Sequence, residues 1–157
     1  MCGIVAGIAN HNIVNMLSNG LSYLEYRGYD SAGISIIDKE NKSLVSYKQV
    51  GKVRELKKLI PEDCVSLAGI AHTRWATHGK PSKSNSHPHT SNNSVAVVHN
   101  GIIENFMVIK TELINLGYNF ESDTDTEVIA HLIHHNMQEN KCVAVAINKA
   151  CKQLSGS

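Results

Sequence analysis

The chain has 157 residues, of which 42% are hydrophobic and 18% charged, and its formal net charge is +1. This length suits one domain or part of one, and the balanced charge argues against a nucleic-acid-binding stripe or a membrane-surface face. No apolar stretch approaches the roughly 20 residues that cross a bilayer, and no targeting segment is evident, so we expect a cytoplasmic protein.

Strands with interspersed helices are predicted through the first half of the chain. Apolar, β-branched stretches predict strands at 2–9, 32–37, 43–50 and 65–71. Apolar side chains at helical spacing predict helices over 12–24 and 53–60. The last of these strands runs directly into a polar segment at 72–79, where chemistry is expected.

The second half is predicted to be mostly helical. A loop rich in Ser, Asn, His and Pro covers 80–93, and a strand follows over 94–99. Helices are expected at 105–116, 124–137 and 141–154, with Gly117 ending the first of them. Runs of strands with interspersed helices indicate an α+β fold with largely antiparallel sheets.

Cys2 is the leading candidate for a nucleophile. Removal of Met1 would give this residue a free α-amine, whose ordinary pKa of about 8 lets it take the thiol proton near neutral pH. One residue would then supply both nucleophile and base. The other cysteines match no zinc or redox spacing, and we expect small buried side chains at Cys64, Cys142 and Cys151.

Arg74 lies in the run His-Thr-Arg-Trp-Ala-Thr-His-Gly at 72–79. A guanidinium offers a planar fork that suits a carboxylate, although a lone arginine is more often in a surface ion pair. Trp75, the only tryptophan, would by default fill the core. Two histidines and two threonines around the arginine favour a site.

Asn100 and Gly101 follow the predicted strand at 94–99. An Asn side-chain amide and a Gly backbone N–H can both point at a developing oxyanion, but for the dipeptide in isolation an ordinary Asn-Gly turn is the more common explanation. Further along, Thr124 and Glu127 form a capping box that would place Asp125 in the first turn of a helix. There its carboxylate is favoured by the helix dipole and can receive a substrate ammonium.

Nine histidines raise the possibility of a metal site. His131 and His135 are one turn apart on a predicted helix, and His87 and His89 flank a proline. No acidic residue completes a known ligand pattern such as His-Glu-x-x-His, so we expect neither a metal nor a cofactor. A histidine-rich metal hydrolase is nevertheless kept as an alternative hypothesis.

Five sequence blocks together resemble one family, the glutaminase domains of glutamine–fructose-6-phosphate aminotransferases, within the class II amidotransferases that use an N-terminal nucleophile. The blocks occur in the family order at 2–5, 25–33, 72–79, 99–105 and 124–131. The resemblance implies two antiparallel sheets between helical layers, the N-terminal-nucleophile hydrolase sandwich. It also implies glutamine as substrate, with glutamate and ammonia as products and the ammonia serving amination of fructose 6-phosphate.

The resemblance also assigns roles residue by residue. It implies that Cys2 is the nucleophile, and that Asn100 and Gly101 form the oxyanion hole. Glutamine would be held by Arg74, Thr77, His78 and Asp125. Trp75 would be a gate on the ammonia route, and His87, in a mobile loop, a further pocket residue.

The ending at Ser157 departs from the family, which continues into more strands and a sugar-phosphate isomerase domain. We therefore expect 2–157 to be a partial amidotransferase domain whose sheets are incomplete. Whether it turns over alone stays open, as does oligomer formation, and a non-catalytic remnant of the enzyme is the alternative. No nucleic-acid or membrane partner is expected.

Overall fold

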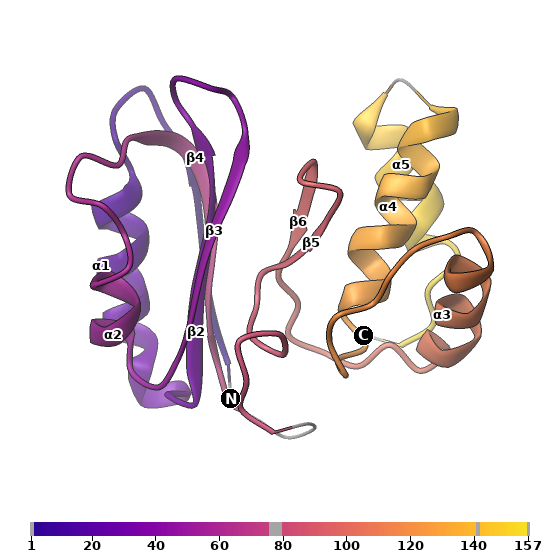
Figure 1. The fold of residues 1–157 in the computed structure, drawn as a ribbon, viewed down its shortest axis with the longest axis horizontal. Helices are drawn as coiled ribbons and strands as arrows, with labels where there is room; N and C mark the ends of the chain where they lie inside the picture. The colour runs from indigo at the N-terminus through magenta and orange to yellow at the C-terminus, as the bar shows by residue number, and fades with distance from the viewer. Residues whose placement is uncertain (1, 76–79, 141, 157) are drawn as a thin grey trace.

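Two antiparallel sheets lie between helical layers in the computed structural model, which describes residues 2–75, 80–140 and 142–156 (Figure 1). The first sheet has the order β1 (Gly3–Ile8), β4 (Ser66–Arg74), β2 (Ser31–Asp38) and β3 (Leu44–Val50). The second pairs β5 (His89–Ser91) with β6 (Val95–Val97). The expected α+β class with antiparallel sheets is confirmed.

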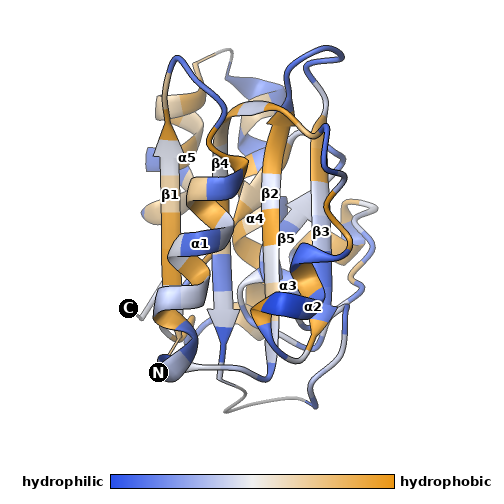
Figure 2. Ribbon diagram, turned by 90° about the vertical axis from the view of Figure 1, so that its left-hand side faces the viewer, coloured by the Kyte–Doolittle hydropathy of each residue, from blue (hydrophilic) through white to orange (hydrophobic). Residues whose placement is uncertain are grey.

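Helices cover the outer faces of both sheets. On the outside of the first sheet lie α1 (Val14–Leu24), the 3₁₀ turn η1 (Glu25–Arg27) and α2 (Val53–Lys57). Beyond the second sheet lie α3 (Phe106–Asn115), α4 (Glu127–Glu139) and α5 (Val143–Cys151). Figure 2 shows α1 and α2 in front of the first sheet, with apolar stretches along the strands behind them.

The first core forms where α1 and α2 meet the sheet. Leu17 and Leu21 of α1 are fully buried against Ile34 and Ile36, which alternate along β2. Residues of odd number in β4 face the same way, since Ala71 belongs to this core. The even-numbered residues of β4, which include His72 and Arg74, therefore face the second layer.

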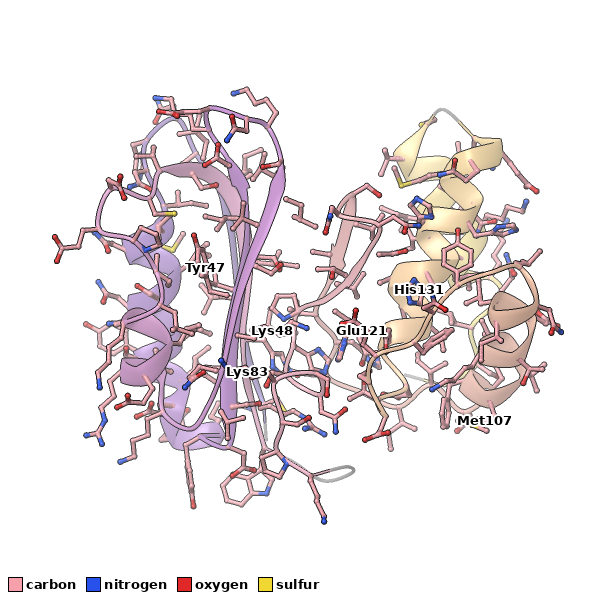
Figure 3. The ribbon with its side chains drawn as sticks, in the orientation of Figure 1. Tyr47, Lys48, Lys83, Met107, Glu121 and His131 are labelled. Carbon is pink, nitrogen blue, oxygen red and sulfur yellow. The ribbon has the colours of Figure 1, made fainter. Side chains whose placement is uncertain are left out.

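A second core lies between the short hairpin β5–β6 and the helices α3, α4 and α5. Val95 of β6 belongs to one buried apolar cluster with Leu113 of α3, Val128 and Leu132 of α4, and Ala150 of α5. The space between the two sheets is more polar: Lys48 reaches from β3 toward Glu121, and both line a cavity of about 560 Å³ there (Figure 3). His131 of α4 borders the same cavity.

Several local predictions are corrected by the structure. The capping box is wrong: α4 begins at Glu127 after Thr126, and no side chain caps it. The Glu127 carboxylate instead accepts hydrogen bonds from the backbone N–H groups of Glu121 and Ser122. Strand β5 lies in the segment 80–93 that the sequence predicts to be loop, because three residues carry too little periodicity to indicate a strand.

The prediction of buried cysteines is also wrong for Cys142 and Cys151, which are exposed, whereas Cys64 is half-buried. Gly117 has the expected left-handed backbone, with a φ of 90°. The N–H of Tyr118 donates to the carbonyl of Leu113, and the N–H of Gly117 donates to the carbonyl of Ile114. Helix α3 therefore ends just before Gly117, as predicted.

We predict that Leu17→Ala lowers the free energy of unfolding by about 2–5 kcal/mol, because it leaves a cavity in a fully buried position. Urea denaturation followed by circular dichroism measures the change. Met16→Ala on the same helix is the matched control, since Met16 is 44% exposed and should lose under about 1 kcal/mol. Equal losses in the two variants would contradict the assigned core.

Candidate active site

A cavity of about 350 Å³ lies beside the start of β1 and the end of β4. Three stretches and three single residues form its wall. These are Arg74 and Trp75, residues 99–102, residues 123–126, Cys2, and His87, with Phe106 at the side. Seven of the nine sequence-predicted site residues are thus gathered at one cavity, and the other two, Thr77 and His78, lie outside the described residues.

Antiparallel pairing of β1 with β4 brings Cys2 to this cavity. Gly3 is paired with Thr73, so the residue before β1 meets the residues that follow β4. The backbone N–H of Trp75 donates to Cys2 Sγ at 3.3 Å. Cys2 is half-buried and borders the cavity, and the partial positive charge of an amide N–H lies against its sulfur.

Arg74 is buried, being only 6% exposed, which rules out the ordinary surface ion pair. Burial lowers the pKa of its guanidinium, while the charges of Cys2, Asp30 and Asp125 act in the opposite direction. The guanidinium thus lies near groups that favour its positive charge, and Arg74 still lines the cavity.

The block at 25–33 packs against the backbone of Arg74 and Trp75. A Cβ on Gly28 would lie 2.9 Å from Arg74 C and from Trp75 N, so only glycine permits this approach. The N–H of Asp30 donates to the carbonyl of Arg74 at 3.1 Å. The block therefore fixes the end of β4 and does not itself line the cavity.

Asn100 and Gly101 lie on the segment between β6 and α3. His72 Nε2 is 2.7 Å from Asn100 Oδ1, so a buried strand residue holds this exposed side chain. Both Asn100 and Gly101 border the same cavity as Cys2. An amide side chain and a glycine N–H are thus available beside the thiol for a developing negative charge.

Asp125 lies before α4, not in its first turn. Its Oδ2 accepts the backbone N–H of Ile103 at 2.7 Å, which ties the segment before α4 to the Asn100–Gly101 segment. The carboxylate is half-buried and borders the cavity. The helix-dipole argument is therefore wrong for this residue, and its position comes from the tertiary contact with Ile103.

His87 is packed, in contrast to the expected mobile loop. It is 6% exposed and stacks on His72 with ring centroids 4.3 Å apart, and His89 meets its other side at 4.6 Å. Gly33 allows the approach, because a Cβ there would lie 2.1 Å from the His87 carbonyl oxygen. Burial lowers the pKa of His87 far below its ordinary value.

Trp75 is not core filler, since 43% of it is exposed. Its ring meets Tyr29 edge-on, with centroids 5.6 Å apart, at the mouth of the cavity that it lines. The role of Trp75 as a gate stays a prediction.

Sequence reasoning missed several wall residues. His99 and Thr126 border the cavity, with His99 Nδ1 3.4 Å from the Thr126 hydroxyl. Asp123 is held there by its backbone N–H, which donates to Asn85 Oδ1 at 2.9 Å. These residues belong to the sequence blocks at 99–105 and 124–131 or adjoin them. Their position in or beside these blocks is the feature of the sequence that could have identified them as wall residues.

The metal hypothesis finds no support in the described parts of the chain, which contain no group of three or more His, Cys, Asp or Glu side chains placed to hold an ion. His131 instead contacts Ser91 Oγ through Nδ1 at 2.8 Å and Glu127 through Nε2 at 3.5 Å. The pKa of Glu127 falls to about 2, since burial, which would raise it, is outweighed by the contact with His131 and by hydrogen bonds from the Ser122 hydroxyl and the backbone amides of Glu121 and Ser122.

A family model described as a glutamine amidotransferase domain matches residues 72–156, more than half of the chain. The chain belongs to this glutamine amidotransferase domain family. The match covers β4 from His72 onward and every later cavity residue, including Arg74, Asn100 and Asp125.

Curated relatives extend the similarity across the whole chain. Glutamine–fructose-6-phosphate aminotransferase (isomerizing) from Acinetobacter baylyi is 52% identical over 158 residues, which cover 100% of this chain and 25% of the relative. The protein of the same name from Francisella tularensis is 53% identical over 159 residues, which cover 26% of it. The chain spans about a quarter of the length of these relatives.

Two solved structures share the fold. Glutamine phosphoribosylpyrophosphate amidotransferase from B. subtilis, complexed with ADP and GMP, matches with a TM-score of 0.77 and 29% identity. The match covers 99% of this chain and 33% of that one. A structure described as the allosteric regulatory enzyme of purine biosynthesis has a TM-score of 0.79 and 30% identity, covering 99% and 34%. The chain thus has the N-terminal-nucleophile amidotransferase fold.

None of the helices that the structure describes is long and apolar enough to cross a membrane.

The buried histidines between the sheets predict a pH-dependent stability. Burial chiefly lowers the pKa of His72 to about 4 and that of His89 to about 3, from an ordinary 6.5. Below pH 6.5 the unfolded chain binds protons that the folded chain does not, so the free energy of unfolding falls as the pH drops toward 4. We expect a loss on the order of 1–3 kcal/mol per histidine, measured by urea denaturation between pH 7 and pH 4.5.

His89→Gln should give a shallower slope of stability against pH over this window. His11→Gln is the matched control, because His11 is an exposed surface residue, and its slope should equal that of the parent. Glu127 does not interfere, since its lowered pKa affects stability only between about pH 4.5 and pH 2. An unchanged slope in His89→Gln would contradict the assignment.

Proposed function

We propose that residues 2–157 form part of a glutamine amidotransferase domain that hydrolyses glutamine to glutamate and ammonia through a thioester on Cys2. The observation that carries the proposal is the convergence on one cavity of a thiol, a guanidinium, a carboxylate and an Asn-Gly pair, at Cys2, Arg74, Asp125, Asn100 and Gly101. Its volume of about 350 Å³ lies in the range of small-molecule sites.

Glutamine is held at its amino-acid end by opposite charges. The Arg74 guanidinium binds the α-carboxylate, and burial strengthens this pairing by excluding water. The Asp125 carboxylate receives the α-ammonium. Thr77 and His78 stay predicted pocket residues that follow Trp75 in sequence.

Acylation begins with the thiol of Cys2. After Met1 is removed, the α-amine of Cys2 takes the thiol proton, and the thiolate attacks the side-chain amide carbon of glutamine. The carbonyl oxygen becomes an oxyanion, stabilised by the Asn100 side-chain amide and the Gly101 backbone N–H. The protonated α-amine then gives its proton to the leaving nitrogen, so ammonia departs and a thioester remains.

Deacylation repeats the same steps with water. The α-amine takes a proton from water, whose oxygen attacks the thioester carbon. The same two donors stabilise the second tetrahedral intermediate. Collapse breaks the C–S bond, returns the proton to the sulfur and frees glutamate, so one water is consumed for each glutamine.

The relatives' name suggests the fate of the ammonia, which is amination of fructose 6-phosphate to glucosamine 6-phosphate on a sugar-phosphate isomerase domain. Trp75, exposed beside the cavity, is positioned to gate the ammonia route. The chain covers 25% of the Acinetobacter relative, and we assign to it only the glutamine half of this reaction. A cytoplasmic location and an oligomeric state stay predictions.

Cys2→Ala is expected to abolish glutamine hydrolysis, because no other described thiol lines the cavity. Glutamate release measures the activity, and intact-mass analysis should show that Met1 is absent. An electrophilic glutamine analogue should label Cys2 once per chain. Cys64→Ser is the matched control, since Cys64 is remote in the α1-side core, and it should keep both activity and labelling.

Hydrolysis that survives Cys2→Ala would overturn the mechanism. A folded parent chain that neither hydrolyses glutamine nor takes up the label would support the alternative, a non-catalytic remnant.

Asp125→Asn should raise the KM for glutamine at least tenfold, because the variant loses the negative charge that pairs with the α-ammonium. The neutral amide still occupies the same volume. Glutaramic acid, which lacks the α-amino group, is the discriminating substrate, and its kcat/KM should be nearly equal in parent and variant. A similar loss for both substrates would show that Asp125 acts only through its contact with Ile103.

A further inference from the structure

The Asn100 carboxamide has two ends, and only one of them can stabilise an oxyanion. Its nitrogen donates two hydrogens, whereas its oxygen only accepts. A half-turn of the side chain exchanges the two ends at almost no steric cost. Asn100 is exposed and lies between β6 and α3, outside any strand or helix. Neither backbone pairing nor burial therefore fixes which end faces the substrate.

His72 contacts the oxygen end. Its Nε2 is 2.7 Å from Asn100 Oδ1, and since that oxygen has no hydrogen, Nε2 must donate. Both hydrogens of the Asn100 amide nitrogen then stay available at the cavity that Asn100 borders. The contact selects the orientation that an oxyanion hole requires.

His72 is held more rigidly than the Asn100 side chain that it contacts. His72 lies on β4, inside the sheet, where it is paired with Ile4 on one side and Gly33 on the other. It is 1% exposed, and its ring stacks on His87 with 19° between the planes. A strand in the middle of a sheet thus fixes an exposed amide on a connecting segment.

The surroundings of the ring also favour the required tautomer. Burial lowers the pKa of His72 to about 4, so the ring is neutral at pH 7 and carries one hydrogen. Its Nδ1 is buried and has no hydrogen-bond partner among the described residues. A hydrogen on Nδ1 would be a buried, unpaired donor, whereas a hydrogen on Nε2 is satisfied by Asn100.

We propose that His72 is a positioning residue of this site: its Nε2–H holds Asn100 Oδ1, so that the Asn100 amide nitrogen faces the cavity as an oxyanion donor. The inference rests on the proposed function, since it assigns Asn100 its part in glutamine hydrolysis. His72 itself does not border the cavity and touches no substrate.

Kinetics of the parent and of position 72 variants test the role. His72→Leu should lower kcat for glutamine hydrolysis about 10- to 100-fold with KM changed less than threefold, because the oxyanion exists only after the attack. His72→Gln should recover most of kcat, since a carboxamide N–H can replace Nε2–H. His131→Leu removes another buried histidine that does not border this cavity, and should keep kcat within about twofold.

A double-variant cycle separates positioning from general damage. In the Asn100→Ala background, His72→Leu should cause almost no further loss of kcat, because the group it orients is gone. A full additional loss there, or equal damage from His72→Gln and His72→Leu, would overturn the inference. Thermal denaturation confirms that each variant is folded.

Nitrogen NMR of the parent chain gives a readout that does not depend on activity. Long-range ¹H–¹⁵N correlation should show His72 as the Nε2–H tautomer at pH 7, and an Nδ1–H tautomer would overturn the inference. A parent that does not hydrolyse glutamine, or hydrolysis that survives Cys2→Ala, would instead refute the proposed function. In that case the tautomer seen by NMR would still test the hydrogen bond from His72 to Asn100.

Discussion

The register between β1 and β4 is the constraint on which the site depends. Pairing of Gly3 with Thr73 places Cys2 beside the residues that follow β4 and leaves its sulfur within reach of the Trp75 amide. The same register puts Cys2, His72 and Arg74 on one face of the sheet. A slip by one residue would turn His72 and Arg74 toward the α1 core, where their burial would cost several kcal/mol and the cavity would lose its cation.

The inner face of this sheet differs from its outer face. Outside, Leu17, Leu21 and the β2 isoleucines form an ordinary apolar core. Inside, three neutral imidazoles pack together between the layers: His72 stacks on His87, and His89 meets His87 edge-on. Imidazoles suit this place because they pack like aromatic rings yet offer a hydrogen bond, as His72 does to Asn100 and His89 does with Thr124.

Glycines bring the backbone segments around the site close together. Gly28 allows the 25–33 block to lie on Arg74 and Trp75, and Gly33 allows the His87 carbonyl to lie on β2. Any side chain at either position would separate these segments by displacing backbone atoms, which are less able to move than the end of a side chain. The block at 25–33 thus has a packing role in the site, although it contributes no residue to the cavity wall.

The sequence alone determined the α+β class, most of the longer elements and the family blocks, because periodicity and motif order are local properties. It also singled out Cys2, Arg74, Asn100, Gly101 and Asp125, whose proposed roles still await the experiments above. It could not find β5, which is three residues long, and it misjudged Asp125, Glu127 and the two exposed cysteines from local helix signals and average burial.

Only the tertiary structure decided that His87 is packed, that Asp125 is held by Ile103, and that His72 orients toward Asn100. Each of these rests on contacts between segments far apart in the chain, and such contacts leave no periodic pattern in the sequence.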